Sequence, residues 1–126
     1  MIAAIDPGSD KCGLAVLDSD NQVLKQEILA RSKLEEKIIA VNQKYDLQVV
    51  ILGDGTVSTE IRKEIEEVGL MVKMVDESNS TLEAQKLYWR YNPPQGWRKL
   101  IPISLQSPPR AVDDYAAVIL AKRYVK

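Results

Sequence analysis

Acidic side chains stand at four places where an apolar run ends or a helix is expected to begin. In chain order they are Asp6, Asp54, Asp76 with Glu77, and Asp113 with Asp114. Neighbouring strands of a sheet lie about 4.8 Å apart, so acids at their ends can share one or two divalent ions. Carboxylate oxygens are ligands that Mg²⁺ and Mn²⁺ prefer in proteins. The set therefore indicates a metal site.

Each of these acids also has a structural interpretation. Asp is common in turns after strands and at helix starts, because it accepts backbone N–H bonds and suits the helix dipole. A cluster of acids without a metal, however, costs free energy through like-charge repulsion and raises pKa values. We favour the metal interpretation for the set, because four separate strand or helix ends carry acids.

Composition narrows the remaining chemistry. The chain has 126 residues and no histidine, which removes the usual zinc ligands, a histidine general base and a Ser-His-Asp triad. Any catalysis must therefore use carboxylates, hydroxyls or lysine. The net charge is −1, from 17 basic and 18 acidic residues, so no global cationic field indicates a nucleic-acid partner.

Cysteine usage and hydropathy indicate the cellular compartment. Cys12 is the only cysteine, so no internal disulfide can form. No apolar run approaches the roughly 18 residues that span a bilayer, and no charged leader with an apolar stretch precedes the first strand. We expect one soluble domain over residues 1–126 in a reducing cytoplasm, with no membrane partner.

Apolar patterning predicts the elements that must position the acids. Strands are expected at residues 1–6, 12–17, 22–29, 47–52 and 70–75. Helices are expected after an N-cap at Ser32, after an N-cap at Ser58 or Thr59 with closure at Gly69, from Ser80 or Thr81 to Tyr91, and over residues 111–124. Residues 101–105 remain open between a short strand and a loop. The order is βββαβαβαα, which predicts an α/β fold with one mixed sheet and helices on its faces.

Three motifs occur in an order typical of one family. They are Asp-Pro-Gly at 6–8 with Gly-Leu-Ala-Val at 13–16, Asp-Glu-Ser-Asn-Ser-Thr at 76–81 with Ala84, and Asp-Asp-Tyr-Ala-Ala at 113–117 with apolar residues after it. On these motifs the chain resembles the YqgF (RuvX) group of Holliday junction resolvase-like proteins, in the RNase H-like superfamily. Two positions depart from the family pattern: Ser78 replaces an Arg, and Gly-Asp-Gly at 53–55 replaces a Gly-Leu-Pro-like turn.

The resemblance implies a five-stranded mixed sheet of order 3-2-1-4-5 with helices on both faces. It implies a metal-dependent endonuclease that hydrolyses phosphodiesters in branched DNA or precursor ribosomal RNA with two Mg²⁺ or Mn²⁺ ions. The implied catalytic residues are Asp6, which bridges both ions, with Glu77, Asp113 and Asp114. The candidate metal ligands are Asp6, Asp54, Glu77 and Asp113.

Two choices within that set stay open. Asp54 follows the strand beside the first one, whereas Glu77 must span roughly 10 Å from a strand further away. Asp113 and Asp114 are consecutive, and the motif alone does not choose between them.

One segment, residues 84–112, contains no acid and interleaves basic with aromatic residues. A solvated helix followed by a loop with packed aromatics would also explain this composition. We expect it to contact nucleic acid, with phosphate contacts and one stacking residue. The residues concerned are Arg90, Arg98, Lys99 and Arg110 for phosphates and Trp97 for stacking. Because a Holliday junction is two-fold symmetric, the resemblance also implies a homodimer.

Two rival functions remain. A non-catalytic RNase H-like module that binds nucleic acid or a protein is favoured by Ser78 and by the near-neutral charge. A phosphate-binding ATPase shares the first motif, but 126 residues provide only one of the two domains that close over a nucleotide.

Overall fold

The computed structural model describes residues 1–94, 96, 100, 108 and 110–125. Three strands come first, and helices and strands alternate after them. The elements are β1 (Ile2–Asp6), β2 (Lys11–Leu17), β3 (Val23–Ala30), the 3-10 helix η1 (Arg31–Lys33), α1 (Leu34–Tyr45), β4 (Val49–Gly53), α2 (Ser58–Glu67), β5 (Val72–Val75), α3 (Ser80–Tyr91) and α4 (Asp113–Val125). Residues 101–105, left open between strand and loop, lie outside the described residues.

The five strands form one mixed sheet in the order β3-β2-β1-β4-β5. This order and the α/β class confirm the predicted fold. β2 pairs antiparallel with both β1 and β3, whereas β4 is parallel to β1 and to β5. The carboxyl ends of β1, β4 and β5 therefore lie at the same edge, with β1 in the middle of the sheet.

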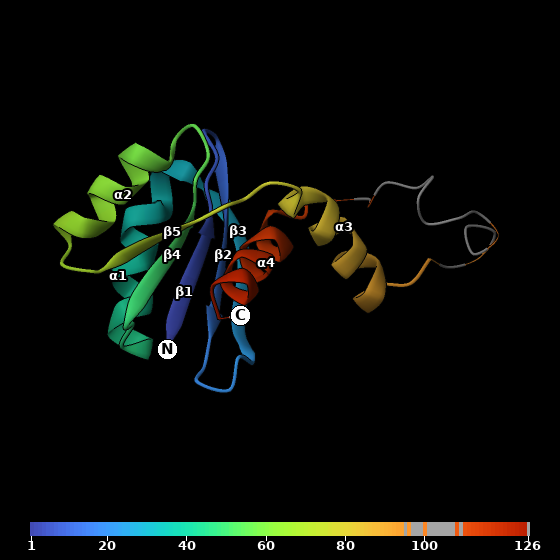
Figure 1. Ribbon diagram of the computed structural model, residues 1–126, viewed down its shortest axis with the longest axis horizontal. Helices are drawn as coiled ribbons and strands as arrows, with labels where there is room; N and C mark the ends of the chain where they lie inside the picture. Colours follow the sequence, from blue (N-terminus) through green and yellow to red (C-terminus); the bar gives the residue numbers. More distant parts are fainter. Residues whose placement is uncertain (95, 97–99, 101–107, 109, 126) are drawn as a thin grey trace.

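Helices cover both faces of the sheet (Figure 1), with α1 and α2 on one face and α4 on the other. Successive side chains of a strand point to opposite faces. In β1, Ala3 and Ile5 belong to the core with α1 and α2, and Ala4 belongs to the core with α4. By the same alternation the next side chain, Asp6, belongs to the α4 face.

α3 packs on α4 and leads away from the body of the molecule (Figure 1). Tyr88 of α3 and Tyr115 of α4 meet edge to face, with ring centroids 5.8 Å apart and an interplanar angle of 88°. Such a pair adds about 0.5–1.5 kcal/mol beyond the area it buries. No helix in the described ranges is long and apolar enough to cross a bilayer.

The predicted side-chain N-caps at Ser32 and at Ser58 or Thr59 are wrong. Ser32 lies inside η1, which leads directly into α1, and no side chain caps either helix. Ser58 is already the first residue of α2, and its N–H donates to the Gly55 carbonyl at 3.1 Å. Backbone hydrogen bonds at the helix start are thus formed where hydroxyl caps were expected. The predicted closure of α2 is confirmed by Gly69, which has φ +90°.

Candidate active site

Asp6 is the last residue of the central strand and pairs with Gly13 of β2. Its pKa is raised from 3.8 to about 7. Burial of the carboxyl is the largest cause, and the charges of Asp113 and then Glu77 add to it. All three influences disfavour the ionised form, and the last two show that Asp113 and Glu77 bring negative charge near Asp6.

Asp113 reaches this edge because α4 begins almost on top of β2. A Cβ added at Gly13 would collide with the backbone carbonyl of Asp113 and would lie 2.9 Å from the Asp114 nitrogen. Only glycine permits so close an approach of helix to strand. Since Gly13 is the partner of Asp6 in the sheet, this approach carries Asp113 to the end of β1.

Glu77 follows β5, two strands away from Asp6, and reaches back across the end of β4. A Cβ added at Gly53 would lie 2.5 Å from Glu77 Oε2, and one added at Gly55 would collide with Glu77 Oε1. The carboxylate thus occupies space that two missing side chains leave over β4. Its pKa is raised, first by burial and then by the charges of Asp54 and Asp76.

Asp54 and Asp76 shape the turn that presents Glu77. Asp54 is exposed, and its Oδ1 accepts the N–H of Glu77 at 3.2 Å. Asp76 Oδ1 accepts the backbone N–H of Ser78 at 2.9 Å and the Ser78 hydroxyl at 2.7 Å, and these bonds lower the Asp76 pKa. Ser78, which departs from the family pattern, therefore serves as the local partner of Asp76.

Asp114 belongs to a different set of contacts from Asp113. It is only 5% exposed, and its carboxylate accepts bonds from Gln26 Nε2 at 2.9 Å and from Arg110 Nη1 and Nη2 at 3.0 and 3.3 Å. Although burial acts to raise the Asp114 pKa, these hydrogen bonds outweigh it and the pKa is lowered. Asp114 ties α4 to β3 and to the end of the 84–112 segment.

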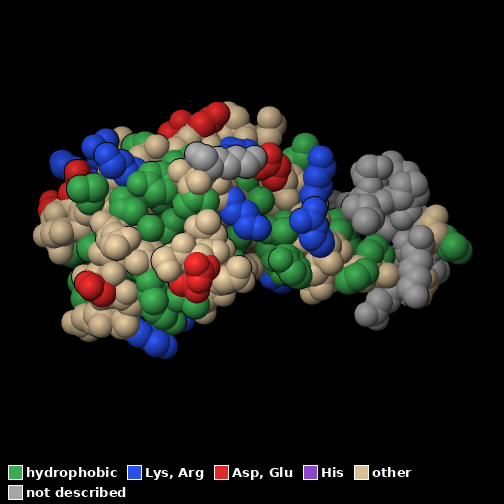
Figure 2. Space-filling model, turned by 60° about the horizontal axis from the view of Figure 1, so that its bottom comes forward, with side chains coloured by type: hydrophobic (Ala, Val, Ile, Leu, Met, Phe, Trp, Pro, Cys, Tyr) green, Lys and Arg blue, Asp and Glu red, His purple; other side chains and the backbone are tan. Residues whose placement is uncertain are grey.

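The residues expected to bind nucleic acid fall into three groups. Arg90 is exposed on α3, and basic side chains stand over this part of the molecule in Figure 2. Arg110 is engaged with Asp114, and its guanidinium lies over the rings of Tyr88 and Tyr115 at 5.4 and 5.2 Å. The remaining three, Trp97, Arg98 and Lys99, lie outside the described residues.

The fit of a divalent cation can be judged from the donors. Among the described residues, no three Asp, Glu, His or Cys side chains are already drawn together closely enough to hold a metal ion. The donors converging on Asp6 are nevertheless all carboxylate oxygens, as Mg²⁺ and Mn²⁺ require. Burial is the largest cause of the raised pKa values of Asp6 and Glu77, and neighbouring carboxylates add to it; a bound cation would offset both effects. The donor set therefore fits the expected ions.

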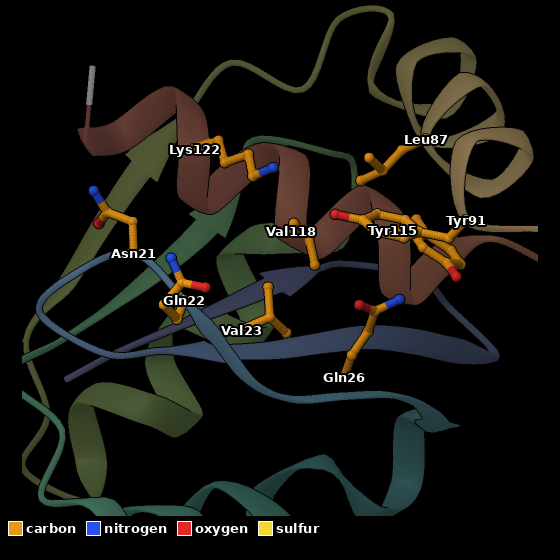
Figure 3. Close-up of a pocket in the computed structure, with 9 residues that line it drawn as sticks. All are labelled: Asn21, Gln22, Val23, Gln26, Leu87, Tyr91, Tyr115, Val118 and Lys122. Carbon is orange, nitrogen blue, oxygen red and sulfur yellow. The ribbon is translucent and has the colours of Figure 1, made fainter.

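A groove of about 560 Å³ lies beside α4 (Figure 3). It runs between the start of β3 and one side of α4, with α3 beside it. Its lining includes Val23, Gln26, Tyr91, Tyr115 and Lys122. None of the carboxylates discussed above lines it, so the candidate active site is an open edge of the sheet rather than this groove.

Sequence reasoning missed residues that carry no chemistry of their own. Gly53 and Gly55 were read only as a departure from the family turn, and Gln26 was not singled out. Small residues beside a strand-end acid were the available signal for the glycines, because glycine in a strand often marks a close approach. Nothing in the sequence links Gln26 to Asp114, since 88 positions separate them.

Solved structures with the same architecture cover almost the whole chain. RuvC of T. thermophilus in complex with a Holliday junction substrate is 14% identical, with a TM-score of 0.62 over 98% of this chain and 92% of that chain. Fowlpox virus resolvase in complex with substrate Holliday junction DNA is 17% identical, with a TM-score of 0.62 over 98% and 95%. The chain has an RNase H-like fold.

A further structure, Thermus thermophilus RuvC, is 12% identical with a TM-score of 0.54, over 98% of this chain and 94% of that chain. No protein-family model matches the sequence, and a search of curated proteins finds no relative. The fold thus agrees with the resolvase resemblance, and the narrower YqgF (RuvX) assignment stays a prediction.

Proposed function

We propose that the chain is a metal-dependent endonuclease of the Holliday junction resolvase type. The observation that carries the proposal is that Asp6, Asp113 and Glu77 come from three separate elements to one edge of the sheet, where the charges of Asp113 and Glu77 add to the burial that raises the pKa of Asp6. A phosphodiester is the substrate class, with branched DNA first, because two proteins of similar fold are complexes with Holliday junctions. Precursor ribosomal RNA is the second substrate to test.

Asp6, Glu77 and Asp113 would hold the two Mg²⁺ or Mn²⁺ ions. When bound, such ions generate hydroxide at neutral pH and stabilise the leaving oxygen. Asp6 stands on the central strand and is partly removed from water, so its charge acts strongly on whatever binds beside it. Asp113 and Glu77 approach it from α4 and from the turn after β5.

Asp54 and Asp114 take supporting roles in this proposal. Asp54 Oδ1 accepts the backbone N–H of Glu77 at 3.2 Å. This bond fixes the backbone position from which the Glu77 side chain extends. Asp114 holds Arg110 and Gln26 and so fixes the start of α4. The proposal therefore takes Glu77 and Asp113, rather than Asp54 and Asp114, as the metal ligands.

Nucleic acid would approach from the side of α3. Arg90 is exposed there, and the segment that follows it contributes further basic residues to the chain, among them Arg98 and Lys99. We expect phosphate contacts from these residues, while Arg110 acts through its bond to Asp114. A homodimer on a two-fold symmetric junction remains part of the proposal, and sedimentation of the protein with and without a junction tests it.

The deciding experiment is a cleavage assay on a four-way DNA junction and on precursor ribosomal RNA, with and without Mn²⁺. Asp6→Asn should abolish cleavage while the protein stays folded. Asp20→Asn is the matched control, because this exposed acid lies in the turn between β2 and β3 and should leave cleavage unchanged. Equal cleavage by wild type and Asp6→Asn would overturn the proposal.

A second candidate function is binding of branched nucleic acid without cleavage. It is favoured by the separation of the carboxylates, since no three are drawn together within the described residues. Calorimetric titration with Mn²⁺ separates the two functions. Binding that is lost in Asp6→Asn supports the nuclease, and its absence in wild type supports the binding module.

A further inference from the structure

Arg123, near the end of α4, grips the turn that carries Glu77. Its Nη1 donates to the Asp76 carbonyl at 2.7 Å, and its Nη2 donates to the Ser78 carbonyl at 2.8 Å. These are the carbonyls of the two residues that flank Glu77. One guanidinium therefore holds the backbone on both sides of the proposed ligand.

The same guanidinium is fixed from a third direction. Its Nη2 lies 3.0 Å from Glu83 Oε2 on α3, and the Arg123 side chain is only 24% exposed. The planar fork of an arginine presents several donors in fixed directions, whereas a lysine offers one compact ammonium on a flexible stem. Lysine at this position would keep the charge and lose the simultaneous grip on two carbonyls.

The turn that Arg123 holds is also restrained within itself, because the Ser78 N–H and hydroxyl donate to Asp76 Oδ1 at 2.9 and 2.7 Å. The Glu77 N–H donates to Asp54, the Glu77 carbonyl accepts from the Ser80 N–H at 3.0 Å, and Asn79 adopts φ 61°. The Glu77 carboxylate extends over Gly53 and Gly55, and neither glycine has a side chain that could pack against it. The position of the carboxylate therefore depends on the position of its backbone.

We propose that Arg123 is the positioning residue of the site: it fixes the turn around Glu77 so that this carboxylate reaches across β4, and it thereby sets the affinity for divalent metal. This inference rests on the proposed function, because it takes Glu77 as a metal ligand. Loss of an outer partner that orients a ligand typically costs roughly 10- to 100-fold in metal affinity, and we expect a loss of that size.

The variants are Arg123→Ala and Arg123→Lys, with Lys122→Ala as the matched control. Lys122 is the neighbouring cation on α4, and its removal changes the net charge equally without touching the turn. Calorimetric titration with Mn²⁺ should give roughly 10- to 100-fold weaker binding for both Arg123 variants and unchanged binding for Lys122→Ala. Wild-type affinity in Arg123→Lys would overturn the positioning role and leave only an effect of charge.

A double-mutant cycle tests whether Arg123 acts through Glu77. In a Glu77→Gln background, Arg123→Lys should cause no further loss of Mn²⁺ affinity, because the group it positions is already gone. A full additional loss would overturn the inference. Arg123→Lys rather than Arg123→Ala is used here because it keeps the packing of the stem and the charge.

Backbone hydrogen exchange separates failure of this inference from failure of the proposed function. If wild type binds no Mn²⁺, the proposed nuclease falls, and exchange at Glu77 and Ser80 still reports on the grip. Faster exchange at these amides in both Arg123 variants, but not in Lys122→Ala, supports the positioning of the turn. Unchanged exchange overturns it whatever Mn²⁺ does.

Discussion

The carboxylate of Glu77 lies where a side chain at Gly53 would be, so the proposed ligand that follows the edge strand β5 extends over the neighbouring strand β4. A Cβ at Gly53 would come within 2.5 Å of Glu77 Oε2. The distance that seemed to favour Asp54, which is one strand closer, is covered because the intervening strand ends in glycine. The lack of a side chain at Gly53 is thus what gives the Glu77 carboxylate its place over β4.

Gly55→Ala should weaken Mn²⁺ binding without lowering stability. The nearest atoms to the added methyl group belong to the Glu77 carboxylate, and a flexible side chain can turn away at little cost. Gly55 does not need a left-handed backbone, since its φ is outside that region. Calorimetric Mn²⁺ titration and urea unfolding measure the two effects. Full Mn²⁺ affinity in Gly55→Ala would show that Glu77 need not lie over β4.

Gly13→Ala should have the opposite profile and lower the free energy of unfolding by about 2 kcal/mol. The methyl group would meet the backbone of Asp113 rather than a mobile side chain, so α4 or β2 must shift. Urea unfolding of Gly13→Ala beside Gly55→Ala measures the difference. Equal unfolding midpoints for wild type and Gly13→Ala would contradict the close approach of α4 to β2.

Asp113→Asn and Asp114→Asn should separate binding from stability, although the two residues are neighbours. Asp113→Asn should lose Mn²⁺ binding and keep its unfolding midpoint. Asp114→Asn should keep Mn²⁺ binding. Its free energy of unfolding should fall by about 1–2 kcal/mol, because Arg110 and Gln26 no longer donate to a charged carboxylate. The reverse pattern would make Asp114 the ligand.

Asp6 should make the metal-free protein less stable as pH rises from about 4 to 7. Its pKa is 3.8 in the unfolded reference and about 7 in the fold, so in this window the folded state holds a proton that the unfolded state has released. Stability then falls with pH. Asp6→Asn removes this dependence and should be about 2 kcal/mol more stable than wild type above pH 7, after allowance for solvent screening.

The measurement is urea unfolding in EDTA at a series of pH values. Wild type and Asp6→Asn should agree near pH 4 and diverge toward pH 8, because other acids titrate alike in both proteins. Saturating Mn²⁺ should reverse the order at pH 8 by stabilising only wild type. Parallel pH curves without metal would mean that Asp6 has an ordinary pKa.

Removal of Arg98 and Lys99 should weaken binding to a four-way junction and flatten its salt dependence, because each lost phosphate contact releases fewer counterions. Lys33→Ala with Lys63→Ala is the matched control. These exposed lysines belong to η1 and α2, away from α3, and their substitution removes the same charge as the loss of Arg98 and Lys99. Identical slopes of log affinity against log salt for the two double variants would refute a contact by Arg98 and Lys99.

The strands and the acid at the end of the first one were predictable because apolar periodicity is a local pattern, whereas the strand order was implied by the family resemblance. Asp6 was found in this way, at the end of an apolar run on the middle strand. The choice between Asp113 and Asp114 was not predictable. Consecutive helical residues differ by about 100° in direction, and the sequence does not record which direction faces the sheet.

Partnerships across long separations were also beyond the sequence. Arg110 was predicted to contact phosphate because its neighbours in the sequence are basic and aromatic. In the structure its guanidinium pairs with Asp114 and lies over the rings of Tyr88 and Tyr115. Arg123 was not singled out from the sequence. Its bonds to the 76–78 turn depend on how α4 crosses the sheet, which follows from packing rather than from local pattern.

α4 touches the proposed site at both ends, with Asp113 in its first turn and Arg123 ten positions later. That separation corresponds to about 15 Å along a helix, so the length of α4 sets the spacing between one acid and the turn that bears another. Insertion of a single residue between them would rotate Arg123 by about 100° and withdraw it from both carbonyls. In this fold, insertions and deletions within α4 should therefore be far less tolerated than substitutions on its solvent side.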